Sequence, residues 1–209
     1  MNSPHNKSMQ EIEVKFLIRD LPALNNRFKE LNVKLLSERT HELNYRYDTP
    51  DHHFTRQMQV LRLRQDQSAT LTFKSAADPA SEVSSRQEIE FEVGDFDTAR
   101  RFLQALGYEV SIIYEKYRTT YQLNDCLLML DEMPYGNFLE IEGPDAAAIR
   151  KMADSLQLNW DKRIKLSYLA VFYRLKEKYD LKASNLLFKE VSSSPIPLEE
   201  FLSNLTNDK

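Results

Sequence analysis

The chain of 209 residues is poor in glycine and cysteine, and both shortages narrow the range of possible functions. Its four glycines form neither a GxxxxGK[ST] phosphate loop nor a GxGxxG dinucleotide fingerprint. The single cysteine, Cys126, excludes an intramolecular disulfide framework and a cysteine-rich zinc site. Because Leu127 and Leu128 follow it, we expect an inert core thiol rather than a reactive one.

Long apolar runs and an excess of basic residues are also lacking. No apolar run has the length of a membrane span, and no signal peptide precedes the first predicted strand. The formal net charge of −4 argues against a general nucleic-acid-binding protein, which usually carries a basic excess. The hydrophobic share of 42% is enough for a core. The composition therefore predicts a cytoplasmic protein with no nucleic-acid and no membrane partner.

Residues 10–17 form the first patterned stretch, in which charged and apolar residues alternate as they do in a β-strand. Glu11, Glu13 and Lys15 share one face of this strand. Two carboxylates two residues apart repel each other, and their placement is reasonable if a cation binds between them. For this stretch alone, a solvated strand face is the alternative.

The following residues alternate between strand and helix patterns. One helix is expected over about 22–32. A second should run from Asp95 or Asp97 to Gly107, with Phe102, Leu103 and Leu106 as its apolar stripe. Two further helices are expected to begin at Asp145 and at Lys165. Residues 75–85 are small and polar, which is typical of a mobile loop. Strands are expected over 33–42, 60–64, 69–74, 86–93, 114–121, 126–131 and 138–143.

The two ends of the chain and one loop lie outside this pattern. Residues 1–9 are polar and expected to be flexible, 10–178 form the predicted domain, and 179–209 are a C-terminal extension to which the sequence gives no function. His52 and His53 are adjacent in the loop after Pro50. Neighbouring side chains on an extended chain point in opposite directions, which disfavours a metal site at this pair.

Charged side chains recur at alternate positions in six of the predicted strands, with apolar residues between them. A sheet with one solvated face would favour Thr, Ser, Gln and Lys at its polar positions, whereas Glu and Arg dominate here. We therefore expect the sheet to curl into a barrel, with helices covering its apolar outside and the charges lining its interior.

Charges of both signs inside a barrel are costly to bury without a ligand. Carboxylates without Cys or His partners suit the hard cations Mg²⁺ and Mn²⁺. Arginine and lysine suit phosphate oxygens. The interior is therefore predicted to hold a polyanion together with a divalent cation.

The motifs in the predicted strands also resemble a known family when they are taken in order. The sequence contains ExExK at 11–15, LRLR at 61–64, TFK at 72–74, RxExE at 86–90, KxR at 116–118, LDE at 130–132, FLEIEG at 138–143 and SY at 167–168. This ordered set resembles the CYTH superfamily, the triphosphate tunnel metalloenzymes, over about residues 10–175.

The resemblance implies an α+β fold, in which an antiparallel eight-stranded β-barrel forms a tunnel and helices pack on the outside. It implies metal ligands at Glu11, Glu13, Asp131, Glu140 and Glu142, with Glu90 as a further candidate. It implies that triphosphate is bound by Lys15, Arg62, Arg64, Lys74, Arg86, Lys116, Arg118 and Lys165, among which Lys15, Lys74 and Arg118 are the predicted catalytic residues.

The implied function is a phosphohydrolase that depends on Mg²⁺ or Mn²⁺ and acts on inorganic, nucleoside or thiamine triphosphate. A class IV adenylyl cyclase and a polyphosphate- or nucleotide-binding module without turnover are the alternatives. We favour hydrolysis because attack by water requires only the polyphosphate to be held, whereas a cyclase must also hold the nucleoside. The expected partner is a triphosphate-containing small molecule, and a homodimer is left open.

Overall fold

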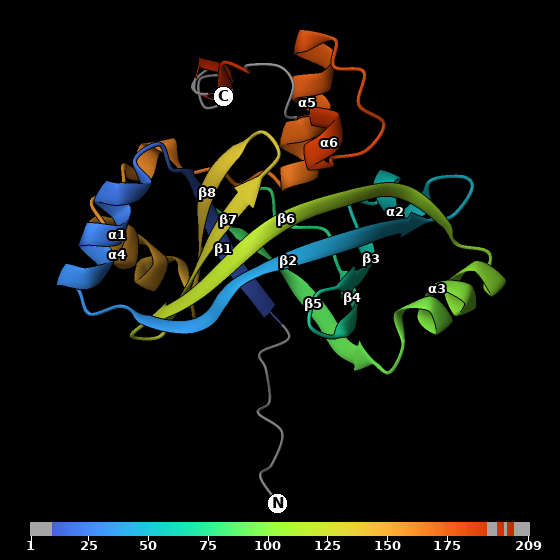
Figure 1. The fold of residues 1–209 in the computed structure, drawn as a ribbon, viewed down its shortest axis with the longest axis horizontal. Coiled ribbons are helices and arrows are strands. Elements are labelled where there is room, and N and C mark those ends of the chain that lie inside the picture. The colour runs from blue at the N-terminus through green and yellow to red at the C-terminus, as the bar shows by residue number, and fades with distance from the viewer. Residues whose placement is uncertain (1–9, 192–195, 199, 203–209) are drawn as a thin grey trace, which may run out of the picture.

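A closed barrel of eight antiparallel strands forms the centre of the protein in the computed structural model (Figure 1). The structure describes residues 10–191, 196–198 and 200–202, so the predicted flexible segment 1–9 lies outside the described residues. The strands follow the order β1-β5-β4-β3-β2-β6-β7-β8, which confirms the predicted barrel. They are β1 (Gln10–Leu17), β2 (Lys34–Asp48), β3 (Val60–Gln65), β4 (Ala69–Lys74), β5 (Ser84–Val93), β6 (Glu109–Leu123), β7 (Cys126–Met133) and β8 (Gly136–Glu142).

Strands β2 and β6 are longer than the sequence pattern predicts. Each contains 15 residues, whereas the alternation indicated strands over 33–42 and 114–121. The two strands pair over nearly their whole length, with three register irregularities, and they cross the front of the barrel in Figure 1. In this paired context the polar Asn44 and Arg46 continue the inward face of β2, so the strand does not end where its apolar pattern fades.

Helices pack against the outside of the barrel, as predicted. They are α1 (Leu21–Glu30), α2 (His53–Arg56), α3 (Phe96–Ala105), α4 (Ala146–Ser155), α5 (Tyr168–Tyr179) and α6 (Phe188–Val191), with a 3₁₀ helix, η1, at Trp160–Lys162. The predicted caps are present: the side chains of Asp20, Asp95 and Asp145 each accept a hydrogen bond from a backbone N–H three residues later. The last long helix begins at Tyr168 rather than at Lys165, with Ser167 as its N-cap.

Two apolar clusters join these helices to the barrel. Helices α1 and α4, at the left of Figure 1, pack with the apolar faces of β1, β7 and β8, where Phe28, Ile149 and Met152 are buried. Helix α5, at the top of Figure 1, buries Phe172 and Leu175 against another cluster. Leu198, Phe201 and Leu202 pack in that same cluster. The described part of the predicted C-terminal extension therefore joins the core.

Helix α3 departs from its predicted apolar stripe. Leu103 is buried against β3, but Phe102 and Leu106 are 61% and 58% exposed. The face that packs is formed by Phe96 and Ala99 together with Leu103, because β3 lies on that side of the helix. Ile89 and Phe91 on β5 are also exposed, so the described helices do not cover the whole outer face of the barrel.

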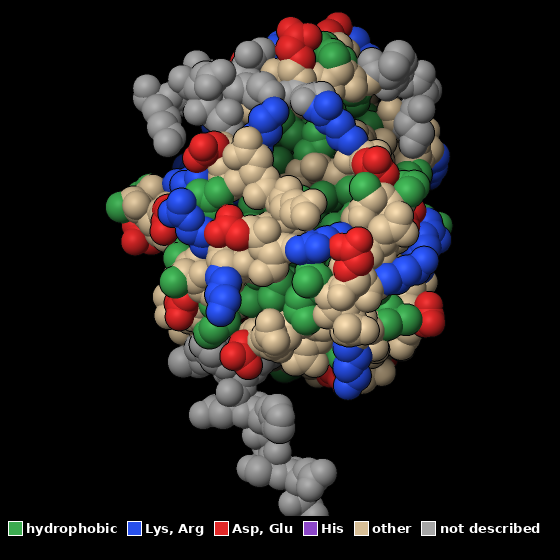
Figure 2. Space-filling view, turned by 90° about the vertical axis from the view of Figure 1, so that its left-hand side faces the viewer, with side chains coloured by type: hydrophobic (Ala, Val, Ile, Leu, Met, Phe, Trp, Pro, Cys, Tyr) green, Lys and Arg blue, Asp and Glu red, His purple; other side chains and the backbone are tan. Residues whose placement is uncertain are grey.

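The side of the molecule that carries α1 and α4 faces the viewer in Figure 2. Lys and Arg side chains are interspersed there with Asp and Glu, and hydrophobic side chains lie in the hollows between them. Cys126 is buried in the cluster with α4, which confirms its predicted place in the core, and burial raises the pKa of its thiol. Among the described residues, no helix is long and apolar enough to cross a membrane.

Candidate active site

The inward side chains of the barrel surround a cavity of about 390 Å³. Its lining contains eight lysine and arginine side chains and eight carboxylates, drawn from seven of the strands and from the β3–β4 turn. The alternation of each strand selects these residues, because every second side chain points to the same face of the sheet. The basic residues in the lining are Lys15, Arg46, Arg62, Arg64, Lys74, Arg86, Lys116 and Arg118.

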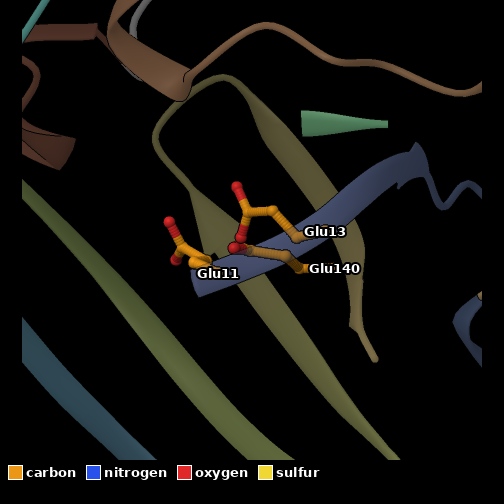
Figure 3. A group of neighbouring side chains, drawn as sticks. All are labelled: Glu11, Glu13 and Glu140. Atoms are coloured by element: carbon orange, nitrogen blue, oxygen red, sulfur yellow. The ribbon is translucent and has the colours of Figure 1, made fainter. Parts of the chain in front are cut away.

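Three carboxylates meet on one side of this cavity (Figure 3). Glu11 and Glu13 come from β1 and Glu140 comes from the neighbouring strand β8. One carboxylate oxygen from each lies within 4.8 Å of the others, and all three residues are buried. Atom Oε2 of Glu13 is buried without a hydrogen-bond partner. An all-oxygen group with an unpaired carboxylate oxygen fits a hard divalent cation such as Mg²⁺ or Mn²⁺.

The protonation of this trio depends on the bases around it. Burial and the adjacent Glu140 raise the pKa of Glu13 to about 8, although Lys15 opposes the shift. Burial also opposes ionisation of Glu140, but Lys15 and Arg118 hold the pKa of its carboxyl well below the usual range. For Glu11, Lys74 and Arg86 outweigh burial and lower the pKa to about 2. Within the trio, the pKa of Glu13 is therefore raised, whereas the pKa values of Glu11 and Glu140 are lowered.

Basic side chains close the ring around the carboxylates. Lys15 forms an ion pair with Glu13 and lies 3.6 Å from Glu140. Lys74 Nζ is 2.5 Å from a carboxylate oxygen of Glu11, and Arg86 Nε donates to the other oxygen at 3.0 Å. These bases lie directly beside the candidate metal ligands, so a phosphate bound by them would also contact the cation.

Asp131 is fully buried and organises a second group of charges. It accepts hydrogen bonds from Lys116 Nζ at 3.0 Å, from Arg118 through two nitrogens at 2.6 Å each, and from the hydroxyl of Tyr168 at 2.8 Å. Arg118 also reaches Glu140 at 2.8 Å. Asp131 is outside the carboxylate trio, and its contacts support a role in orienting Lys116 and Arg118. Its predicted role as a metal ligand remains a prediction.

Glu90 faces the two arginines of the LRLR motif. Its carboxylate accepts a hydrogen bond from Thr72 at 2.9 Å and lies 3.3 Å from Arg62 and 3.7 Å from Arg64. Arg64 also lies 3.0 Å from Asp66. Glu90 thus holds the arginines in position from the opposite strand and, like Asp131, is outside the trio.

Two further residues of the predicted set lie apart from these contacts. Glu142 lines the same cavity, next to Glu13 across the β1–β8 pair, without joining the trio. Lys165 is absent from the cavity lining and donates to the backbone carbonyl of Ser81 at 2.9 Å. No histidine belongs to the group of candidate metal ligands found among the described residues.

Glu42, Arg46 and Tyr114 are among the lining residues that the predicted set omits. Glu42 on β2 is buried and lies 3.4 Å from Lys116, and Lys116 and Arg118 outweigh burial to lower its pKa to about 2. Arg46 on the same strand and Tyr114 on β6 also face the cavity. Glu42 stands in the strand pattern HELNYRY, whose inward face is recognisable only by extending the alternation past the apolar Leu43.

The start of α5 lines one end of the cavity. Ser167, Tyr168 and Leu169 belong to its lining. The ring of Tyr168 packs on Phe138 with 5.3 Å between centroids, and its hydroxyl reaches Asp131. Toward the other end, the lining includes the β3–β4 turn, where Gln67 is exposed. The cavity thus extends through the barrel from the β3–β4 turn to the start of α5.

The geometry of a closed barrel with an inward-facing ExExK strand agrees with the comparison to protein families. The CYTH domain family matches residues 9–168, which includes all eight strands. The chain belongs to the CYTH family. The resemblance deduced from the ordered motifs is thereby confirmed.

Curated relatives of this CYTH protein include two named for the same activity. A Methanocaldococcus jannaschii protein named "Putative adenylate cyclase" is 28% identical over 137 residues, 64% of this chain and 77% of the relative. The adenylate cyclase CyaB of Aeromonas hydrophila is 25% identical over 142 residues, 68% of this chain and 72% of the relative.

Solved structures share the fold. A Vibrio parahaemolyticus protein described as a "putative adenylate cyclase" superposes with a TM-score of 0.68 at 23% identity. The superposition covers 80% of this chain and 99% of the Vibrio chain. A Hippeastrum protein, described as a "putative adenylyl cyclase" that reveals a dominant triphosphatase activity, superposes with a TM-score of 0.59 at 18% identity. That superposition covers 78% of this chain and 95% of the Hippeastrum chain. The family match and the two curated relatives support the interpretation of the CYTH protein as an enzyme of the triphosphatase or cyclase type.

Proposed function

We propose that this CYTH protein hydrolyses a triphosphate substrate bound inside the barrel. The observation that carries the proposal is the juxtaposition of eight basic side chains with a buried carboxylate trio in one cavity of the barrel. Phosphoryl transfer requires positioning and neutralisation of charge more than covalent chemistry by the protein. The described lining supplies both.

Different residues of the lining would bind the metal ion and the phosphate groups. Glu11, Glu13 and Glu140 would hold Mg²⁺ or Mn²⁺, which supplies positive charge to phosphate oxygens when bound. Lys15, Lys74 and Arg86 lie beside that trio and would bind phosphate oxygens at the same place. Arg118 and Lys116 are held rigid by Asp131, so their charges need little reorganisation as the reaction proceeds.

A cyclase is the second candidate, and two observations favour it. The curated relatives carry that name. In addition, Leu127 and Met129 on β7 give the charged lining an apolar portion, which an organic group attached to the triphosphate would require. Hydrolysis remains the proposal because it requires only that the polyphosphate is held and water reaches the reacting phosphorus.

One product analysis separates these functions. The purified protein is incubated with tripolyphosphate, ATP and thiamine triphosphate, each with Mg²⁺ and with Mn²⁺. Free phosphate identifies a hydrolase, and cyclic AMP with pyrophosphate identifies a cyclase. Binding of a triphosphate without any product identifies a binding module and refutes both enzymatic functions.

The carboxylate trio is tested by Glu140→Gln, which keeps the shape of the side chain and removes its charge. Metal-dependent turnover should be abolished, because the trio loses one of its anionic ligands. The matched control is Glu132→Gln on the neighbouring strand β7, since Glu132 pairs with Arg39 outside the cavity. Wild-type turnover by Glu140→Gln would refute the assignment of the trio.

A further inference from the structure

Charges in the cavity lining are matched across neighbouring strands in most places. Five directly opposed pairs join an acid to a base, and such pairs stabilise a sheet, whereas like charges directly opposite destabilise it. These pairs are Glu11 with Arg86, Lys15 with Glu140, Glu42 with Lys116, Lys74 with Glu88, and Arg118 with Asp131.

Two directly opposed pairs of the cavity lining break this rule. Glu13 faces Glu142 across β1 and β8, beside the carboxylate trio, where a cation would separate the two charges. Arg46 faces Arg62 across β2 and β3, and both side chains line the cavity. By the same reasoning, the arginine pair marks a position where an anion separates two positive charges.

Arg46 lacks the partners that its neighbours have. Arg62 contacts Thr72 and Glu90, and Arg64 contacts Asp66 and Glu90, whereas the side chain of Arg46 donates only to the carbonyl of Gln59, at 3.2 Å, among the described residues. Within the described ranges, no carboxylate lies within 4.0 Å of the Arg46 guanidinium. Burial also lowers the pKa of Arg46. A buried cation without an anion destabilises the ligand-free protein.

The location of Arg46 identifies which part of a substrate reaches it. Arg46 interacts electrostatically with Tyr173 of α5, and it lies opposite Ile112, which packs in the α5 cluster. It therefore lies toward the end of the cavity that α5 lines. A substrate whose organic group lies toward the opposite end, at the β3–β4 turn, presents the terminus of its phosphate chain to Arg46.

We propose that Arg46, together with Arg62, binds the terminal phosphoryl group of the triphosphate at the α5 end of the tunnel. Arg46 is thereby a determinant of chain length, since a diphosphate lacks the third phosphoryl group that the two arginines would bind. The proposal rests on the proposed use of a triphosphate in this cavity. It assigns a role to a residue outside the motifs of the resemblance.

The test compares Arg46→Gln with wild type, using Arg39→Gln as the control on the outer face of the same strand. The probes are a methylene-bridged triphosphate and methylenediphosphonate, both of which resist hydrolysis. Each probe is titrated into the protein in the presence of Mg²⁺, and its binding is measured by calorimetry. Arg46→Gln should weaken triphosphate binding about tenfold or more, the usual effect of losing a hydrogen bond to a charged group. The loss for the diphosphate should be smaller, and Arg39→Gln should bind both probes as wild type does.

The melting temperature of the ligand-free protein distinguishes phosphate binding by Arg46 from a purely structural role of this residue. Removing one of two opposed, buried cations should raise the melting temperature of ligand-free Arg46→Gln and reduce its rise on adding the triphosphate. Arg46→Lys retains the charge without the planar fork, so it should recover part of the affinity and none of the added stability.

The outcomes are distinguishable. Unchanged triphosphate binding by Arg46→Gln, equal losses for both probes, or a lower melting temperature of the ligand-free variant would each overturn the role of Arg46. If wild type binds neither probe, the proposed function fails and this inference fails with it.

Discussion

Asp131 offers the most direct test of how the tunnel is held together. Its carboxylate is fully buried and receives Lys116, Arg118 through two nitrogens, and Tyr168. Replacing it by asparagine preserves the shape but leaves two buried cations without their shared anion. Breaking a buried ion pair costs about 3–5 kcal/mol. Because Arg118 keeps Glu140 at 2.8 Å and Lys116 keeps Glu42 at 3.4 Å, we expect the lower end, about 3 kcal/mol.

The expected loss is large enough to measure by two methods. For a domain of this size, 1 kcal/mol corresponds to about 2–4 °C, so Asp131→Asn should lower the melting temperature by about 6–12 °C. Urea unfolding should give a lower midpoint with an unchanged slope. The control is Asp154→Asn on the exposed surface of α4, which should remain within about 0.5 kcal/mol of wild type. If Asp131→Asn is as stable as wild type, Asp131 does not orient the two bases.

Three further predictions follow from individual contacts. Since the pKa of Glu42 is about 2 in the folded protein and ordinarily 4.5, its stabilising contribution is complete above about pH 4.5 and is lost as the pH falls through 2. Urea unfolding between about pH 5 and 2 should show wild type losing about 3 kcal/mol more than Glu42→Gln, and parallel curves would contradict the assignment. Tyr168→Phe should lower the unfolding free energy by about 1.5–3 kcal/mol through loss of the hydrogen bond to Asp131, whereas an unchanged urea midpoint would show that this bond contributes nothing. Cys126 should react with a thiol reagent only after denaturation, because its thiol is buried with a raised pKa, and rapid labelling of the native protein would show that α4 opens.

Much of the site could be predicted from short-range pattern. Glu11, Glu13 and Lys15 must share a face if residues 10–17 form a strand, because the side-chain period of a strand is two. The same rule places Arg62 with Arg64 and Lys116 with Arg118. The helix starts at Asp20, Asp95 and Asp145 were equally predictable, since each carboxylate satisfies a backbone donor that the helix itself leaves unpaired.

Other features depend on which strands become neighbours. Asp131 and Glu140 stand in similar sequence patterns, but pairing of β7 with β6 surrounds Asp131 with Lys116 and Arg118, while pairing of β8 with β1 brings Glu140 to Glu11 and Glu13. Lys165 carries the expected charge, yet it lies before α5 begins and contacts the chain at Ser81 instead of the cavity. Exposure of Phe102 likewise reflects where β3 lies relative to α3.

By itself, then, the sequence determined which side chains share a face, where the helices begin, and that charges of both signs would gather inside a barrel. Those properties follow from local geometry, which repeats every two or 3.6 residues along the chain. Only the tertiary structure decided which acid meets which base, that Arg46 and Arg62 oppose each other, and that the start of α5 lines the cavity. Strand order and register fix those contacts, and they arise from packing between segments far apart in the chain.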